Sequence, residues 1–288
     1  EPISPFKQLP TIDASIAPYE VVIENPEACG RYSGILIEGV KVGPSPAWLK
    51  NKLQSIGARS INNIVDITNY ILHELGQPLH AFDADKIKGK VTVKTLDKDT
   101  AFTTLDGVER SLDDDQLMIT NGIDNLCIAG VFGGQTSGIS EQTTSVFLES
   151  AYFNPVSVRK TARFHGLNTD ASFRFERGVD PALTMYALQR CVQLIQEIAG
   201  GQVAMKAFDW QGNIPQDKTT SISLNRINQL IGCQIDKSDV ISILKDLDIQ
   251  ILSDNGDNLE IQIPAYRVDV TREADVVEEI LGLINKRR

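Results

Sequence analysis

Apolar residues recur along this chain at two spacings, and each spacing indicates a type of element. Alternation with a period of two predicts extended strands, whereas apolar residues three and four positions apart predict amphipathic helices. The strand pattern covers residues 31–42 and dominates residues 90–148, where Asp106-Gly107 and Asn121-Gly122 mark tight turns. Its last part, residues 144–148, predicts a buried strand that delivers Glu149 at its end.

The helical pattern recurs four times before residue 200. Helices are predicted over residues 46–56, 61–75, 155–165 and 181–199. The second is expected to begin at Ser60 as N-cap and to end at Gly76, and the third to end at Gly166. Asp180-Pro181 predicts an N-cap followed by proline at the first helical position of the fourth.

Changes in composition divide the chain into three parts. Residues 1–26 carry several prolines and no periodic pattern, so they are interpreted as a lead-in or linker. Residues 27–212 form the main body, and a polar stretch around residues 209–219 marks a domain boundary. Residues 219–288 predict a small unit with strands near 221–224, 249–252 and 259–263 and helices at 225–231, 237–247 and from Thr271 onward. The predicted fold class is therefore α+β, a β-rich domain with packed helices followed by a small α+β domain.

Composition limits the class of protein. With 288 residues, 42% hydrophobic and 23% charged, the chain is typical of a soluble globular protein, and no run is long enough to span a membrane. No signal peptide is recognisable, so cytoplasm is the predicted location. Four scattered cysteines lack the spacing of a zinc site and are interpreted as buried thiols, and no metal site is predicted. A net charge of −10 argues against a free-standing nucleic-acid binder.

Residues 149–181 depart from this acidic average. The stretch holds five cationic side chains against four acidic ones, a local charge of about +1. The cations are Arg159, Lys160, Arg163, Arg174 and Arg177, and the acids are Glu149, Asp170, Glu176 and Asp180. Two interpretations stay open, a surface that meets an anion and a network of surface salt bridges.

Two further features also carry two interpretations each. His80 lies among apolar residues and is either a core histidine with satisfied ring nitrogens or a site residue. Gly130, Gly133 and Gly134 either allow tight sheet packing or let the backbone approach a ligand, and they form neither a dinucleotide fingerprint nor a P-loop. No Ser-His-Asp or Cys-His arrangement is evident, which favours attack by water over a covalent intermediate.

Four long runs carry a family resemblance. They are NNIVDITNYILHELGQPLHAFD, IAGVFGG, FLESAYFNPVSVRKTARFHGLNTDASFRFERGVDP and IPAYRVDVTREADVVEEI. Over nearly all of residues 27–288 the chain resembles the β subunit of bacterial phenylalanyl-tRNA synthetase. The resemblance implies that residues 27–212 are the tRNA editing domain of that subunit and residues 219–288 the small helix-turn-helix-like domain that follows it. It also implies an excised fragment without the amino-terminal domains, the synthetase-like region or the α subunit.

The activity implied by the resemblance is editing, the hydrolysis of tyrosine wrongly attached to the tRNA for phenylalanine. The resemblance places Glu149 against the tyrosine hydroxyl, the backbone of Gly130 and Gly133 along the same pocket, and Thr169 and Ala171 in its wall. It places the catalytic set Thr68, Asn69 and His80 near the ester and the terminal adenosine. Arg159 and Arg163 are expected to contact tRNA phosphates.

The resemblance also suggests cofactors and partners. The fragment itself is expected to need no cofactor, whereas the whole synthetase uses ATP and magnesium to ligate phenylalanine to its tRNA. Its partners would be that tRNA and the α subunit, in an α2β2 heterotetramer. Two alternatives remain, a non-catalytic subunit-interaction scaffold and nucleic-acid binding by the last domain. The acidic residues Glu273, Asp275, Glu278 and Glu279 argue against the second.

Overall fold

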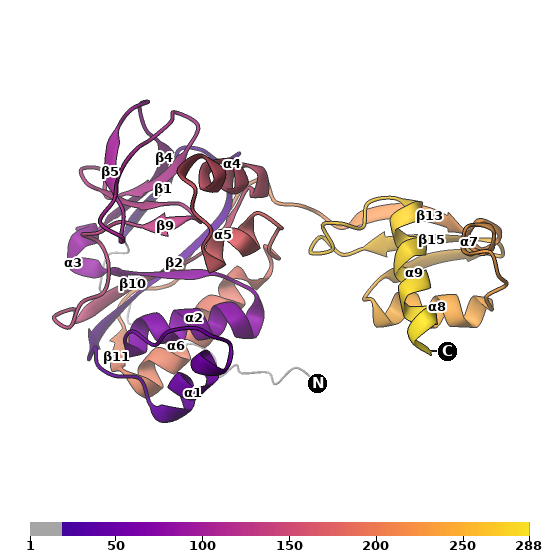
Figure 1. Cartoon of the computed structure of the whole chain (residues 1–288), viewed down its shortest axis with the longest axis horizontal. Coiled ribbons are helices and arrows are strands. Elements are labelled where there is room, and N and C mark those ends of the chain that lie inside the picture. The colour runs from indigo at the N-terminus through magenta and orange to yellow at the C-terminus, as the bar shows by residue number, and fades with distance from the viewer. Residues whose placement is uncertain (1–18, 288) are drawn as a thin grey trace. The chain divides into compact units, whose positions relative to one another are not determined.

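The structure is a computed structural model that describes residues 19–287. It contains two compact units, and the division between them falls between Ile214 and Pro215. Both units mix helices with sheets (Figure 1), so the predicted α+β class is confirmed. Each unit has its own hydrophobic core and is described separately.

A twisted sheet runs through the middle of the first unit. Its strands follow the order β11-β2-β10-β3, with β12 also paired to β2. All these pairings are antiparallel, and β10 lies between β2 and β3. The bounds are β2 Cys29–Val40, β3 Leu79–Asp83, β10 Ser145–Phe153, β11 Gly200–Val203 and β12 Phe208–Gln211.

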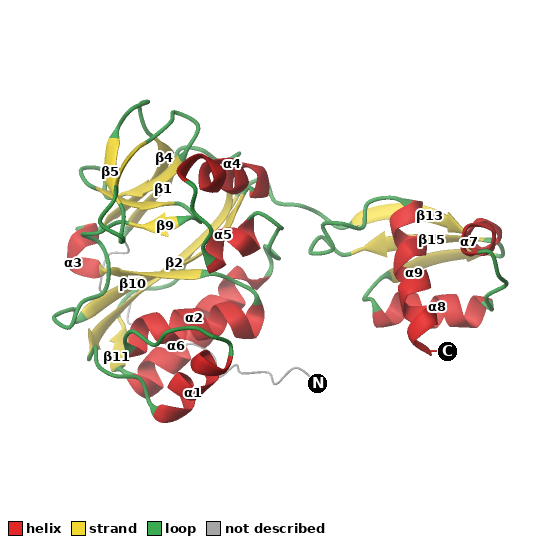
Figure 2. Ribbon diagram, in the orientation of Figure 1, coloured by secondary structure: helices red, strands yellow, loops and turns green. Residues whose placement is uncertain are grey.

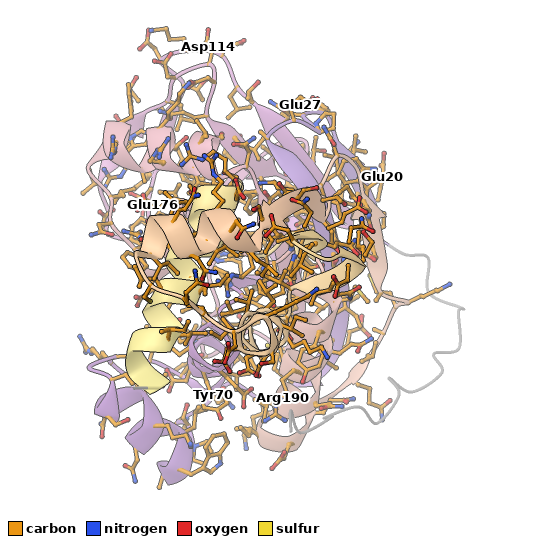
Figure 3. All side chains as sticks on the ribbon, turned by 90° about the vertical axis from the view of Figure 1, so that its right-hand side faces the viewer. Glu20, Glu27, Tyr70, Asp114, Glu176 and Arg190 are labelled. Carbon is orange, nitrogen blue, oxygen red and sulfur yellow. The ribbon has the colours of Figure 1, made fainter. Side chains whose placement is uncertain are left out.

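Helices cover one face of this sheet (Figure 2). They are α1 Ala47–Ser55, α2 Asn63–Leu75 and α6 Leu183–Ile198. Alternate strand residues such as Ile35 and Leu148 face them and share a core with Ile67 of α2 and Val192 of α6. Glu74 of α2 also links that helix to α6, because its carboxylate pairs with Arg190 at 3.2 Å, and it accepts a hydrogen bond from Tyr70 of its own helix. Tyr70 and Arg190 are labelled in Figure 3.

The other face packs on a second sheet of order β1-β4-β7-β8-β9. Its strands are β1 Glu20–Ile23, β4 Lys90–Thr95, β7 Leu117–Thr120, β8 Asn125–Ile128 and β9 Phe132–Gly133. A separate hairpin joins β5 Ala101–Thr103 to β6 Glu109–Ser111. Three short helices complete the unit, α3 Ala84–Ile87, α4 Pro155–His165 and α5 Asp170–Phe175.

The second unit is a three-stranded antiparallel sheet with three helices. The strand order is β13-β15-β14. The bounds are β13 Lys218–Ser223, α7 Leu224–Ile231, α8 Lys237–Asp246, β14 Gln250–Asn255, β15 Asn258–Ile263 and α9 Glu273–Arg287. The order of helices and strands predicted for this part is confirmed.

Two predicted helix starts are wrong. The N-cap of α2 is Asn62, whose side chain accepts from the Val65 N–H at 2.9 Å, whereas the Ser60 hydroxyl donates to the buried carboxylate of Asp66. Helix α6 begins at Leu183, because Asp180 instead closes a turn with the Ala182 N–H at 2.8 Å. In both cases a nearby hydrogen-bond partner competes with the predicted cap.

Three further predictions are corrected by strand and helix positions. Glu149 lies in the middle of β10 and not at its end, because the strand continues to Phe153. Part of the predicted lead-in, Glu20–Ile23, is strand β1, paired in parallel with β4 about 70 residues later in the chain, and residues 1–18 of that lead-in lie outside the described residues. The patch at Thr169 opens helix α5, which the sequence pattern did not reveal.

Candidate functional site

A cavity of about 420 Å³ lies where α2, β3, the β8–β9 turn, β10 and α5 meet. Most of its wall is apolar and includes Val65, Leu72, Leu79, Ile139 and Phe175. The structure brings eight predicted site residues to this cavity. They are Thr68, Asn69, His80, Gly130, Gly133, Glu149, Thr169 and Ala171.

Glu149 is the buried carboxylate of the cavity. It is only 5% exposed, and its Oε2 accepts a hydrogen bond of 2.7 Å from the Tyr32 hydroxyl. Burial raises the pKa of Glu149 from its ordinary value of 4.5 to about 8, while the bond from Tyr32 acts in the opposite direction. On the neighbouring strands, His80 and Gly34 lie directly opposite Glu149. A buried carboxylate thus reaches a largely apolar pocket from an interior strand of the sheet.

Glycines keep the wall beside the strands thin. Gly130 has a φ of +69°, and a Cβ there would lie 3.0 Å from the Phe153 ring. A Cβ at Gly133 would lie 2.9 Å from the Leu105 side chain and 3.1 Å from the His80 ring. Tight packing therefore requires both glycines, and both also line the cavity. The packing interpretation is confirmed for Gly130 and Gly133, and close approach of their backbone to a ligand stays a prediction.

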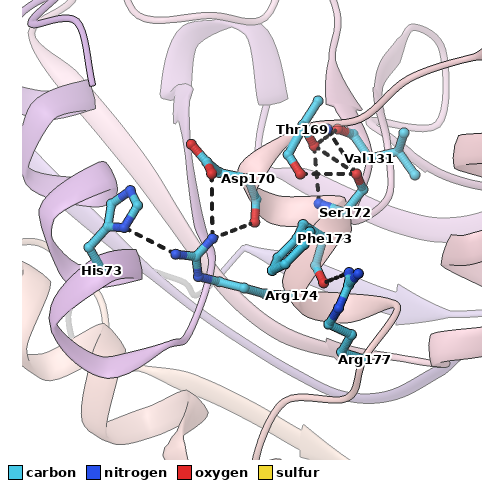
Figure 4. Close-up of polar contacts among 8 residues, drawn as sticks. All are labelled: His73, Val131, Thr169, Asp170, Ser172, Phe173, Arg174 and Arg177. Atoms are coloured by element: carbon cyan, nitrogen blue, oxygen red, sulfur yellow. Dashed lines mark hydrogen bonds and ion pairs between the residues drawn. The ribbon is translucent and has the colours of Figure 1, made fainter. Parts of the chain in front are cut away.

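The opposite wall is the start of α5. Thr169 is its N-cap and forms a capping box with Ser172, and the Thr169 hydroxyl also lies 2.9 Å from the Val131 carbonyl oxygen, to which it donates (Figure 4). The small side chain of Ala171 follows and lines the cavity. The cap therefore fixes α5 against the β8–β9 turn and fixes the wall with it.

A second link joins α5 to α2 through two residues that do not line the cavity. The Arg174 guanidinium lies 3.0 Å from Nδ1 of His73 and donates to the Asp170 carbonyl oxygen, also at 3.0 Å (Figure 4). It also pairs with the Asp170 carboxylate at 3.5 Å. Burial and the adjacent guanidinium lower the pKa of His73, which keeps the ring neutral and able to accept.

The polar side chains of α2 and β3 form the remaining part of the site. The Thr68 hydroxyl donates to the Val65 carbonyl oxygen at 2.8 Å, and within residues 19–287 the Asn69 amide makes no hydrogen bond. Nε2 of His80 is buried and likewise has no hydrogen-bond partner in the described part of the chain. Burial lowers the pKa of His80 to about 4, so its ring is neutral at pH 7. The interpretation of His80 as a core histidine with satisfied nitrogens is therefore wrong.

Two family models match the chain, and the boundary between them lies close to the boundary between the two compact units. Residues 28–200 match the B3/4 domain, and residues 220–284 match the tRNA synthetase B5 domain. The chain belongs to the B3/4 domain family. In this chain, the cavity residues from Thr68 to Phe175 all lie within the B3/4 domain.

Two curated proteins similar to this chain are beta subunits of phenylalanine–tRNA ligase. The phenylalanine–tRNA ligase beta subunit of Bacteroides fragilis (strain YCH46) is 53% identical over 265 residues, which cover 92% of this chain and 32% of that protein. That of Porphyromonas gingivalis (strain ATCC BAA-308 / W83) is 52% identical over 284 residues, covering 97% and 34%. The resemblance stated from the sequence is confirmed. The chain spans about a third of the length of the curated relatives it matches.

A solved structure also aligns with the chain. It is an N-terminal fragment of the phenylalanyl-tRNA synthetase beta-subunit from Pyrococcus horikoshii, with 16% sequence identity and a TM-score of 0.46. The alignment covers 96% of this chain and 78% of that one.

The five cations of residues 149–181 fall into two groups. Arg174 and Arg177 are in ion pairs with Asp170 and Glu176, as the salt-bridge interpretation predicts. Arg159, Lys160 and Arg163 are exposed on α4, and none has an ion-pair partner among residues 19–287. Neither Arg159 nor Arg163 lines the cavity. Exposed cations without partners are available to an anion, so α4 fits the other interpretation.

Two cavity residues, and the tyrosine that contacts Glu149 from behind the cavity wall, were not predicted from the sequence. Tyr32 lies in β2, more than 100 residues before its partner Glu149, and reads locally as a core position. Val131 and Phe175 line the cavity between predicted residues but are apolar, so nothing in their type indicated a site. Only the strand register and the packing of α5 bring them together.

Three other predicted features bear on the described part of the chain: metal binding, membrane spanning and the cysteines. There, no group of three or more His, Cys, Asp and Glu residues could hold a metal ion. Within the same residues, no helix is long and apolar enough to cross a membrane. All four cysteines are free, and Cys29, Cys127 and Cys191 are buried as predicted, whereas Cys233 is only partly buried.

Proposed function

We propose that this chain hydrolyses the ester that joins tyrosine to the tRNA for phenylalanine, within a phenylalanyl-tRNA synthetase. The observation that carries the proposal is Glu149, a buried carboxylate on the wall of an apolar cavity. A phenol ring would occupy the apolar part, and its hydroxyl would donate to Glu149. Since a charged group is costly to bury without partners, a cavity that keeps one is suited to a ligand with a matching donor.

The chemistry of the two amino acids explains the need for such a second site. Phenylalanine and tyrosine differ by one hydroxyl, and an apolar pocket rejects an added hydroxyl only about a hundredfold. A pocket that hydrogen-bonds the hydroxyl rejects the ligand lacking it by roughly 10⁴ to 10⁵. Editing at a pocket with a buried carboxylate therefore supplies the discrimination that an apolar synthetic pocket lacks.

Water is the proposed nucleophile. His80 is neutral at pH 7, and its buried Nε2 is available to orient a water molecule or a ribose hydroxyl. Asn69 offers an uncommitted amide, and Thr68 lies one position before it on α2. These three residues would bind and orient the ester and the terminal adenosine, while Gly130, Gly133 and Ala171 keep the cavity open.

The partners follow from the same proposal. The tRNA for phenylalanine would bring its charged end to the cavity, and Arg159 and Arg163 of α4 would contact its phosphates. The chain would work beside the synthetase α subunit in an α2β2 assembly located in the cytoplasm. ATP and magnesium would serve phenylalanine ligation elsewhere in that assembly, and editing by this chain would need neither.

The direct test compares two esters on two proteins. Hydrolysis of tyrosyl-tRNA and phenylalanyl-tRNA, both on the tRNA for phenylalanine, is measured with the wild-type chain and with Glu149→Ala. At a pH above 8, where Glu149 is ionised, loss of a charge-assisted hydrogen bond, about 1.5 to 3 kcal/mol, predicts roughly ten- to hundredfold slower hydrolysis of the tyrosyl ester. The phenylalanyl ester should not be slowed, since it offers no hydroxyl to the carboxylate.

A second variant separates recognition from access. Ala171→Leu narrows the cavity without touching Glu149, so both esters should be slowed together. If the wild-type chain hydrolyses neither ester, the interaction-scaffold alternative is favoured. If Glu149→Ala slows both esters equally, Glu149 supports the fold or the water and does not read the hydroxyl.

A further inference from the structure

The hydrogen bond from Tyr32 engages only one of the two carboxylate oxygens of Glu149. The Tyr32 side chain is completely buried, and its hydroxyl donates to Oε2 at 2.7 Å. Among residues 19–287, no hydrogen bond reaches Oε1. Glu149 lines the cavity, so the oxygen left without a partner belongs to a side chain that faces this cavity. One oxygen is thus fixed by the protein and the other remains available.

No positive charge assists this carboxylate. The titratable groups facing Glu149 are Tyr32 and Cys29 from β2, Cys127 from β8 and His80 from β3. Burial raises the pKa of Cys29, Cys127 and Tyr32, and burial lowers that of His80 to about 4. All four are therefore neutral at pH 7.

The charges at the cavity rim leave this conclusion unchanged. Asp170 of α5 also lines the cavity, but it is exposed and paired with Arg174 at 3.5 Å, and Arg174 is oriented toward His73 as well. Glu149 receives no ion pair from any described residue. The Tyr32 hydroxyl is thus the single donor within the described residues that stabilises the carboxylate and fixes its orientation.

We propose that Tyr32 is the positioning residue for hydroxyl recognition: it holds Oε2 of Glu149 and presents Oε1 to the hydroxyl of a phenol bound in the cavity. The identity of the ligand rests on the proposed function, whereas the effect of Tyr32 on Glu149 does not. A donor at Oε2 favours the ionised carboxylate, which accepts the phenol hydrogen. It also restricts the rotamers of the Glu149 side chain, because rotation would break the hydrogen bond to Tyr32.

The experiment removes only the hydroxyl group of Tyr32. Tyr32→Phe keeps the ring in the core and removes the donor. Tyr152→Phe is the matched control, because Tyr152 is also a buried tyrosine of the same core and makes no hydrogen bond with Glu149. The titration of Glu149 is followed by ¹³C NMR of glutamate-labelled protein, and its resonance is assigned with Glu149→Gln. Hydrolysis of the two esters is then measured with the same proteins.

The expected result is an upward shift of the Glu149 midpoint by roughly one pH unit or more in Tyr32→Phe, and none in Tyr152→Phe. The ratio of kcat/KM for the tyrosyl ester to that for the phenylalanyl ester should fall about tenfold in Tyr32→Phe, with the phenylalanyl value unchanged. An unchanged midpoint in Tyr32→Phe overturns the inference. A shifted midpoint in a chain that hydrolyses neither ester supports the inference and contradicts the proposed function instead.

Discussion

Burial makes the ionised form of the Glu149 carboxylate energetically unfavourable in the folded protein. Its carboxylate is buried with one hydrogen bond from Tyr32 and no ion pair within the described chain, and burial raises its pKa to about 8. The unfolded chain would ionise this group near its ordinary value of 4.5. Between these two pH values the folded state binds a proton that the unfolded state has released. The folded state therefore loses stability as pH rises through this window.

A stability measurement with Glu149→Gln tests this. Glutamine keeps the shape of the side chain and an acceptor for Tyr32 but cannot ionise. The free energy of unfolding of the variant, relative to that of wild type, should increase by about a few kcal/mol when the pH rises from 5 to 8.5. Urea denaturation at both pH values measures the difference. If the difference in free energy of unfolding between the variant and wild type does not change with pH, Glu149 has its ordinary pKa in the folded protein.

The sequence allowed Glu149 and most of the residues around it to be predicted, but not the donor that holds its carboxylate. An isolated glutamate after a run of apolar residues is visible along the chain, and the family resemblance assigned its role. Tyr32, in contrast, is one aromatic residue within a strand pattern. Its importance comes from the register between β2 and β10, which sets Tyr32 opposite Ala151, two positions from Glu149. Register is a property of the folded sheet and cannot be read from local composition.

Some helices end where the local sequence dictates, whereas other elements depend on partners far away in the chain. Gly76 and Gly166 end α2 and α4 with positive φ, as predicted, because the glycine itself provides the left-handed conformation. Strands β1 and β12 were missed because each is short and pairs with a strand far away in sequence. Helix α5 has six residues, too few for a periodic pattern, and depends on its cap and on Arg174.

Helix α5 should lose its alignment with α2 when Arg174 is replaced. Arg174→Ala removes the bond to His73 and both contacts with Asp170. Because Thr169 and Ala171 of the same helix line the cavity, hydrolysis of both esters should fall together, by roughly threefold to tenfold, the equivalent of about 1 kcal/mol. Their ratio should not change, since Glu149 is untouched.

The control for this variant lies on the next turn of the chain. Arg177→Ala removes an ion pair with Glu176 and a contact over the Phe173 ring at 3.5 Å, both outside the cavity. It should leave both rates near wild type. His73→Ala should reproduce part of the Arg174→Ala effect. If Arg174→Ala changes the ratio of the two esters, α5 takes part in reading the hydroxyl.

At the scale of the whole molecule, charge is distributed unevenly. The net charge is −10, and acidic side chains such as Glu20, Glu27 and Asp114 lie at the periphery (Figure 3). Against this background, α4 exposes Arg159, Lys160 and Arg163 without ion pairs in the described chain. An acidic molecule with a small basic patch should bind RNA weakly and in a salt-dependent way.

Binding of the tRNA for phenylalanine tests this patch. Replacing Arg159 and Arg163 with alanine should weaken binding and reduce the slope of log K against log salt by about one to two. Replacing Lys50 and Lys52 of α1 removes the same charge elsewhere and is the control. Fluorescence anisotropy across a salt series gives both slopes. Equal losses in the two double variants would mean that net charge, and not the α4 patch, governs binding.

The central place of β10 in its sheet has a consequence for amide exchange and heat. Glu149 lies on a strand paired on both sides, with β2 and β3, and so belongs to the part of the fold that opens last. Its backbone amide should exchange with deuterium only through global unfolding. The geometry around its carboxylate should persist while termini and loops fray on warming. Discrimination between the two esters should therefore hold almost to the melting temperature and then disappear together with the fold.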